Sequence, residues 1–331
     1  MELLKTLTHC VSPSGRENSV REIIKNELRD VCDEIFTDAL GNIICHKSGN
    51  GKRLMLAAHM DEIGFMVTYI DDNGFLRFST VGGVRSHNSI NLPIEFPNGT
   101  KGKISYEKEL TPSNVNFDKM FIDIGATTKS EAEKKVQIGD MAVYSGNFEI
   151  IGERIMSKAL DDRSGCWSLV RAMQSAKDSP NDLYAVFTAQ EEVGLRGAKT
   201  AANRISPDMA IAIDVSTATD IPESTSCSIK LGKGPAIKLK DASFIIHGAV
   251  KNLLLDCVNS DKIPFQLQAA SLGGTDTGAI HVSGYGVPGG TISIPTRYVH
   301  SATEVIDCND LKNTCNLIQT VIATDITNYL I

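Results

Sequence analysis

The chain has 331 residues, more than the ~250–300 at which single hydrophobic cores stop growing, so two domains are expected. Its formal net charge of −7 and its lack of Lys/Arg runs exclude nucleic acid and an anionic membrane as the main partner, which favours a small molecule or a peptide. Without an N-terminal export signal or an 18-residue apolar stretch, a cytoplasmic protein is expected.

The first elements predict an α/β protein. Ser14-Gly15-Arg16-Glu17 has the pattern of a capping box, and apolar residues then recur at helical spacing, which predicts a helix from about 17 to 30. A short apolar run over 53–58 predicts a strand that ends at His59, and a second strand is expected over 63–70. Eight scattered cysteines without a CxxC pair are expected to be mostly buried, reduced thiols.

The middle of the chain has a different character. Asp71-Asp72-Asn73-Gly74 predicts a turn between strands, further Pro and Asn-Gly turns follow, and helical periodicity is scarce except around 129–135. Residues 64–145 are therefore predicted to form a small β-rich domain, inserted into an α/β domain made of residues 1–63 and 146–331.

Alternating strands and helices resume after Gly146. A helix is expected over 163–177 and another over about 310–329. Continuous apolar runs at 183–189 and 209–213 predict strands that are buried on both faces of a sheet.

Acidic and imidazole side chains follow three of the predicted strands. His59 ends the first, Glu191-Glu192 follows the run 183–189, and Asp214 ends the run 209–213. Because ligands of open α/β sheets bind outside the carboxyl ends of the strands, these residues are predicted to face one crevice. With Asp161-Asp162 and His300 they provide enough ligands for two metal ions and one further carboxylate.

Two of these segments suggest more specific roles. Asp61 lies two residues from His59, so in an extended segment it can accept the second ring N–H of that imidazole and raise its basicity. Glu191 and Glu192 are adjacent, so one can bind metal while the other faces a water nucleophile; a solvated loop is an equally good interpretation of this pair alone. Asp162-Arg163 alone could be an ion pair at a helix start.

The chain resembles the M42 metallo-aminopeptidases, relatives of the glutamyl and tetrahedral aminopeptidases. The resemblance extends over nearly the whole chain in the family's order, through the segments PSGRE at 13–17, HMDEIG at 59–64, KALDDR at 158–163, QEEVG at 190–194, AID at 212–214, GTD at 274–276 and PTRYVHS at 295–301.

This resemblance implies the mixed-sheet, phosphorylase/hydrolase-like fold of di-metal exopeptidases and a set of roles for residues. Two divalent ions would be bound, with Asp161 bridging them. The implied ligands are His59 and Asp214 for one ion and Glu192 and His300 for the other, with Glu191 as general base and Asp61 orienting His59. The β-rich insertion would form dimers, which would assemble into a tetrahedral dodecamer.

The expected activity is removal of N-terminal residues from short peptides. Oxygen-rich ligands with two imidazoles and no thiolate suit Zn²⁺, Co²⁺ or Mn²⁺, and two such ions ~3.5–4 Å apart can lower the pKa of a shared water toward neutrality. Two other functions remain open: a di-metal hydrolase of another substrate, such as a deacylase or a glycan-related enzyme, and a non-catalytic family member. Asp276, in the Gly-rich turn 273–278, could line the substrate pocket, although turn chemistry alone explains its glycines.

Overall fold

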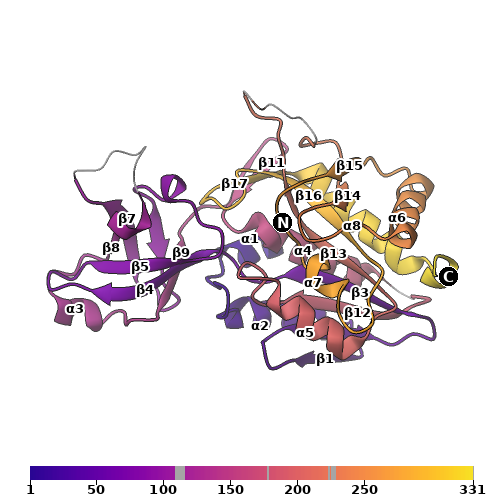
Figure 1. Ribbon diagram of the computed structural model, residues 1–331, viewed down its shortest axis with the longest axis horizontal. Helices are drawn as coiled ribbons and strands as arrows, with labels where there is room; N and C mark the ends of the chain where they lie inside the picture. The colour runs from indigo at the N-terminus through magenta and orange to yellow at the C-terminus, as the bar shows by residue number, and fades with distance from the viewer. Residues whose placement is uncertain (109–115, 177–178, 223, 225–228, 331) are drawn as a thin grey trace.

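The computed structural model describes residues 1–108, 116–176, 179–222, 224 and 229–330. They form a large α/β unit and a small closed β-barrel, which lie side by side (Figure 1). The helices are α1 (Glu2–His9), α2 (Asn18–Leu28), α3 (Lys129–Glu133), α4 (Leu160–Ser175), α5 (Arg196–Ile205), α6 (Gly248–Ser260), α7 (Thr277–Ile280) and α8 (Cys308–Ala323), with 3₁₀ helices η1 (Ser86–Asn88), η2 (Phe117–Lys119) and η3 (Ile326–Asn328).

The large unit contains a mixed eleven-stranded sheet. Nine strands follow the order β1-β2-β12-β3-β13-β16-β17-β11-β10, and β14 pairs with both β16 and β15. The central pairs β12–β3, β3–β13 and β13–β16 are parallel. The strands are β1 (Glu34–Thr37), β2 (Ile43–Lys47), β3 (Arg53–His59), β10 (Glu149–Ile151), β11 (Arg154–Ser157), β12 (Asp182–Thr188), β13 (Met209–Thr217), β14 (Ala236–Lys240), β15 (Gln266–Ala269), β16 (Gly289–Arg297) and β17 (Glu304–Asp307).

Helices cover both faces of this sheet. On one face, a large hydrophobic core joins apolar residues of α1, α2, α4, α6 and α8 to the central strands. On the other, a smaller cluster contains Ala198, Ala201 and Ala202 of α5, Ile280 of α7 and Ala57 of β3. The central strands are thus buried on both faces, as expected for parallel strands flanked by helices.

The small unit is a closed barrel in the order β4-β5-β8-β7-β6-β9. Its strands are β4 (Gly64–Ile70), β5 (Leu76–Val81), β6 (Pro93–Glu95), β7 (Lys101–Tyr106), β8 (Met120–Asp123) and β9 (Met141–Tyr144). Inside it, the ring of Phe65 packs edge-on against Phe78 and Tyr144, with ring centroids 5.2 Å apart in both pairs. The chain passes directly from His59 at the end of β3 into this barrel, which therefore starts beside the crevice of the large sheet.

Several predicted elements differ in detail. Ser14 does not cap α2: its hydroxyl donates to the Asp61 carboxylate, while the Glu17 carboxylate accepts from the backbone N–H groups of Gly15 and Gln190. The strand expected to end before Asp214 continues to Thr217, so Asp214 lies within β13. The last helix ends at Ala323, and a separate 3₁₀ turn follows.

The seven cysteines in the described segments are free, and four of them are buried; Cys227 lies outside those segments. In the same segments, no helix combines the length and the apolar character that crossing a bilayer requires.

Candidate metal centre

The carboxyl ends of the central parallel strands bring the predicted residues together. His59 is the last residue of β3, where it pairs with Thr188 at the end of β12. Glu191 and Glu192 lie in the turn that follows β12, and Asp214 lies in the neighbouring strand β13. Asp161 reaches the same place from the first turn of α4, and His300 from the connection between β16 and β17.

The side chains form two groups that share Asp161. We call His59, Asp161 and Asp214 the inner group, and Asp161, Glu192 and His300 the outer group. In each group, one potential ligand atom per residue lies within 4.8 Å of the others. The carboxylate of Asp161 connects them directly, since its Oδ1 lies 3.0 Å from His59 Nε2 and its Oδ2 lies 3.3 Å from His300 Nε2. His300 Nε2 is also 3.1 Å from Glu192 Oε1.

The hydrogen bonds of the two imidazoles leave Nε2 available to a metal. His59 Nδ1 lies 3.2 Å from the backbone oxygen of Asp61, and His300 Nδ1 lies 3.1 Å from the backbone oxygen of Gly83. A carbonyl oxygen can only accept, so Nδ1 donates to it in both rings, and loss of the Nε2 proton would leave a lone pair directed at the carboxylates, where a metal ion can bind. This donor set fits two divalent cations with mixed nitrogen and oxygen ligands.

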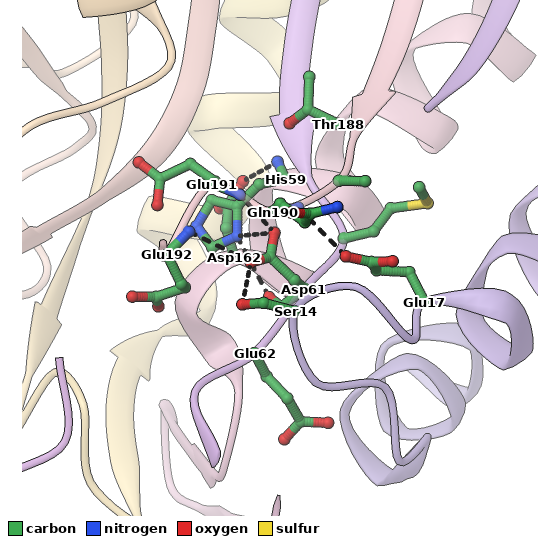
Figure 2. Close-up of polar contacts among 12 residues, drawn as sticks. Ser14, Glu17, His59, Asp61, Glu62, Asp162, Thr188, Gln190, Glu191 and Glu192 are labelled. Carbon is green, nitrogen blue, oxygen red and sulfur yellow. Dashed lines mark hydrogen bonds and ion pairs between the residues drawn. The ribbon is translucent and has the colours of Figure 1, made fainter. Parts of the chain in front are cut away.

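Asp61 supports the site in more ways than its place in the sequence predicted. Its carboxylate lies 3.6 Å from His59 Nδ1, so the carbonyl of Asp61 is the closer partner of that ring. The carboxylate instead accepts from the hydroxyl of Ser14 at 2.6 Å and from the backbone N–H groups of Glu191 and Glu192 at 3.0 and 3.1 Å (Figure 2). Asp61 therefore fixes the turn that carries both glutamates.

Asp162 and Arg163 do not form the ion pair that their adjacency allowed. Asp162 accepts from the backbone N–H groups of His59 and Gly165, at 3.2 and 3.0 Å. The fully buried guanidinium of Arg163 donates to backbone carbonyls, including that of Met60, and to Glu62, at 3.3 Å. Each residue thus holds a segment adjoining the site in place.

Glu304, at the start of β17, was missed by the sequence motifs. Its carboxylate accepts from the backbone N–H of Asp161 at 2.9 Å and from that of His300 at 2.8 Å, and the residue is 2 % exposed. A lone glutamate four residues after His300 gives no sequence signal for this role, because pairing between β17 and β11 brings it beside Asp161. Glu304 holds two members of the outer group at once.

The site concentrates negative charge in a desolvated place. Burial raises the pKa of Glu191 well above its ordinary value, and the charges of Asp214 and Glu192 add to the effect. Burial likewise raises the pKa of Asp214 to about 7 and that of Glu304 to about 8. Asp161 is an exception: burial opposes its ionisation, but hydrogen bonds from His300 and His59 keep its pKa below the ordinary value. A cation would relieve the repulsion among the other carboxylates.

Asp276 lies beside these residues rather than in either group. Its Oδ2 accepts from the Thr188 hydroxyl at 2.5 Å, its Oδ1 has no partner in the described segments, and burial raises its pKa to about 6. The glycines around it belong to a turn over the sheet, held by hydrogen bonds that join the hydroxyls of Thr275 and Thr277 to that of Thr291.

Comparison with known proteins identifies the class to which this fold and site belong. The sequence profile of the family described as M42 glutamyl aminopeptidase matches residues 41–317. A relative named "Putative aminopeptidase" from Acetivibrio thermocellus is 50% identical over 318 residues, 96% of each chain. The lysyl aminopeptidase of Pyrococcus furiosus is 32% identical, over 96% of this chain and 94% of its own.

A solved structure extends the similarity to the fold. It is titled as the Pyrococcus horikoshii TET1 peptidase that can assemble into a tetrahedron or a large octahedral shell. It superimposes with a TM-score of 0.89 at 32% identity and covers 97% of this chain and 98% of that one.

The chain belongs to the M42 glutamyl aminopeptidase family. The expected family, the mixed α/β fold with its small β-domain and the class of enzyme, a hydrolase of peptide bonds that acts as an aminopeptidase, are thereby confirmed.

Proposed function

We propose that this protein removes N-terminal residues from short peptides with a water activated by two divalent metal ions. The observation that carries the proposal is the pair of ligand groups joined through Asp161, with Glu191 beside them in the turn fixed by Asp61. His59, Asp161 and Asp214 would hold one ion, and Asp161, Glu192 and His300 the other. Zn²⁺, Co²⁺ and Mn²⁺ all suit these ligands.

The ions would supply Lewis acidity and a water that is acidic enough to ionise near neutral pH. Glu191 would act as the general base: its Oε atoms take a proton from the attacking water and return it to the nitrogen of the leaving amine. Its raised pKa favours this double role, since a base must both accept and release the proton near the working pH.

Asp61 and Glu304 would act as positioning residues. Asp61 holds the backbone of Glu191 and Glu192, and its carbonyl oxygen sets the tautomer of His59. Glu304 holds the backbone of Asp161 and His300 by accepting hydrogen bonds from their N–H groups. Fixing the ligands before substrate binds lowers the reorganisation that catalysis needs.

We further propose that residues 1–63 and 146–331 form the catalytic domain and that the inserted residues 64–145 form a dimerisation domain. The barrel presents exposed apolar side chains, among them Tyr69 at 51% and Ile138 at 66% exposure, which a partner subunit would cover. The tetrahedron or large octahedral shell described for the P. horikoshii relative supports a homo-oligomer, which we propose to be built from such dimers as a tetrahedral dodecamer. The mass of this protein in solution, measured by light scattering, tests the proposed homo-oligomer.

The function is tested with chelator-treated protein, assayed on a panel of aminoacyl chromogenic amides and short peptides before and after addition of Zn²⁺, Co²⁺ or Mn²⁺. We expect metal-dependent release of the N-terminal residue, abolished when the α-amino group is acetylated. Release from acetylated peptides, or turnover of a polysaccharide alone, would contradict the proposal. Metal binding without turnover of any substrate would indicate a different amide substrate or a non-catalytic protein.

A further inference from the structure

The turn that carries Glu191 is held by side chains from other segments. Within the described parts of the chain, none of the backbone N–H groups of residues 189–192 donates to a backbone oxygen. The first donates to Asn42 at 2.8 Å, the second to Glu17 at 3.1 Å, and the last two to Asp61 at 3.0 and 3.1 Å. The start of this turn therefore depends on three side chains that lie outside it.

The backbone of Gln190 needs such support. Its φ is +58°, in the left-handed region that residues other than glycine rarely occupy. A residue keeps such a conformation only where its surroundings determine it. Because Gln190 directly precedes Glu191, its backbone angles set the direction in which Glu191 leaves the turn. Loss of the contact at Gln190 would let its backbone relax and would move the side chain of Glu191.

Glu17 supplies the contact at Gln190 from the start of α2. Its side chain does not cap that helix: its Oε1 accepts from the backbone N–H of Gly15 at 2.6 Å and from that of Gln190 at 3.1 Å (Figure 2). The other oxygen, Oε2, lies 3.9 Å from Arg21 Nη2. Glu17 is 1% exposed, and burying a carboxylate is costly unless hydrogen bonds compensate. The two N–H groups therefore explain the position of this side chain better than helix α2 does.

The contact from Glu17 needs an acceptor and not a charge. A single oxygen accepts from both N–H groups, and a carboxyl group keeps acceptor capacity in either protonation state. Burial and the nearby charge of Asp61 raise the pKa of Glu17, because both disfavour its ionised form. A glutamine at this position keeps a carbonyl oxygen of the same reach, whereas a methionine keeps the approximate shape and loses the acceptor.

The segment that precedes α2 is itself fixed to the site. We call residues 12–17 the N-terminal clamp. The N–H of Ser12 donates to Glu62 Oε1 at 3.1 Å, and the N–H of Glu62 donates back to the carbonyl of Ser12 at 3.2 Å. The hydroxyl of Ser14 donates to the Asp61 carboxylate at 2.6 Å. The clamp thus reaches the turn by two routes, one direct and one through Asp61.

We propose that the N-terminal clamp positions the general base: Glu17 and Ser14 hold the turn so that the Glu191 carboxylate stays beside the two ligand groups. The inference rests on the proposed aminopeptidase function, in which Glu191 takes the proton from water. Glu17 and Ser14 belong to neither ligand group and take no part in proton transfer. They are positioning residues, so their loss should slow the chemical step and leave the inner ion bound.

The test measures kcat, KM and metal content of the full-length, metal-loaded protein with the best substrate of the panel. Glu17→Met should lower kcat by about 10–100-fold, the scale expected when a reacting group is displaced by about 1 Å. KM and the affinity for the inner ion should stay within about threefold. Glu17→Gln should keep kcat within about threefold of that of the unmodified protein. Glu22→Met, at an exposed glutamate of the same helix, is the matched control.

Ser14→Ala tests the second route with a smaller change. It removes one hydroxyl donor to Asp61 and leaves the two N–H donors of the turn in place. We expect kcat to fall about 3–10-fold, the scale of one hydrogen bond, with KM unchanged. This variant keeps the inference testable if Glu17→Met folds poorly.

Hydrogen exchange separates this inference from the proposed function, because it needs no turnover. Followed by mass spectrometry, the amides of residues 190–192 should exchange at least about tenfold faster in Glu17→Met and at the normal rate in Glu17→Gln. Unchanged exchange in strand β13 shows that the variant is folded. If no substrate is hydrolysed but the amides respond in this way, the proposed function fails and the clamp stands.

Three results would overturn the inference. The first is a normal exchange rate at residues 190–192 in Glu17→Met. The second is a kcat that stays within about threefold of normal in both Glu17→Met and Ser14→Ala. The third is an equal loss of kcat in Glu17→Gln and Glu17→Met, since the charge of Glu17 and not its acceptor would then matter.

Discussion

The inner and outer groups share Asp161 but are held in different ways. The inner residues His59 and Asp214 are 2% and 6% exposed and come from adjacent strands of the large sheet. In the outer group, the His300 side chain is 28% exposed, and its ring depends on the carbonyl of Gly83, which follows β5 of the barrel. The inner group is therefore complete within one unit of the fold, whereas the outer group needs both.

This difference indicates a division of tasks. Ligands held by a packed sheet lose little entropy when they bind an ion, and buried charges interact more strongly. The outer group is more open to solvent and depends on how the barrel segment lies against the sheet. We therefore expect the inner ion to bind more tightly and the outer ion to exchange faster.

The largest effect should come from the residue that the two groups share. Asp161→Asn removes one negative charge from both groups, so we expect loss of both ions and a fall in kcat/KM of about 10⁴-fold or more, the scale at which a catalytic unit fails. Metal content by mass spectrometry and kcat/KM on a good substrate measure this. Retention of two ions with normal turnover would remove Asp161 from the centre.

Glu191→Gln should separate chemistry from metal binding. The amide cannot take a proton from water, so we expect kcat to fall about 10²–10⁴-fold while both ions remain bound. Stopped assays at saturating substrate measure kcat, and titration with Co²⁺ followed by visible absorption shows whether both ions bind. Normal turnover with both ions in place would exclude Glu191 as the base.

Glu304→Gln tests how the outer group is held. The amide can rotate only one acceptor toward the two N–H groups of Asp161 and His300, so the outer ion should bind about 10–100-fold more weakly, as found when the partner of a metal ligand is removed. Calorimetric titration with metal should show weaker binding of the outer ion and nearly unchanged binding of the inner ion. An equal weakening of both steps would contradict the separation of the groups.

Gly83→Ala should disturb the outer group from the barrel side. A Cβ at this position would lie 2.6 Å from His300 Nδ1 and 2.8 Å from Cε1, so the ring must move. We expect the outer ion to bind up to about 10-fold more weakly, a smaller loss because the imidazole can partly readjust. Gly248→Ala is the control, because a Cβ at that position would have no atom within 4 Å. If Gly248→Ala weakened binding of the outer ion as much as Gly83→Ala does, the contact between Gly83 and His300 would not explain the loss.

The smallest effect concerns stability without metal. Asp214 and Glu304 have pKa values raised to about 7 and about 8, chiefly by burial, so the unfolded chain ionises first as pH rises. His300, despite burial, has its pKa raised to about 12 by hydrogen bonds to Asp161 and Glu192, and its contribution also declines above the unfolded value of 6.5. The metal-free protein should therefore lose stability between about pH 4 and 8. Denaturant unfolding with and without Zn²⁺ measures the free energy of unfolding across this pH range. A free energy of unfolding that stays constant or rises with pH in the metal-free protein would contradict the raised pKa values of these residues.

Local patterns in the sequence were enough to predict most elements near the site. The run 53–58 and the run 183–189 are strands β3 and β12 within one residue at each end, because continuous apolar runs of that length suit strands buried on both faces. The change to turn-rich sequence after residue 63 likewise predicted the barrel strands of 64–144. The acidic and imidazole residues were found because each adjoins such a run or a family motif.

Local sequence patterns alone show which residue types stand after the central strands and therefore which chemistry is available. The partners of these residues depend on the folded arrangement of the whole chain: Ser14 donates to Asp61 instead of capping α2, and Glu304 reaches Asp161 through the pairing of β17 with β11. The place of β14 likewise depends on long-range pairing, since it lies beside β16 as well as beside β15, the next strand in sequence. The physical reason is that periodicity reports the local face of a residue, whereas its contacts depend on long-range pairing.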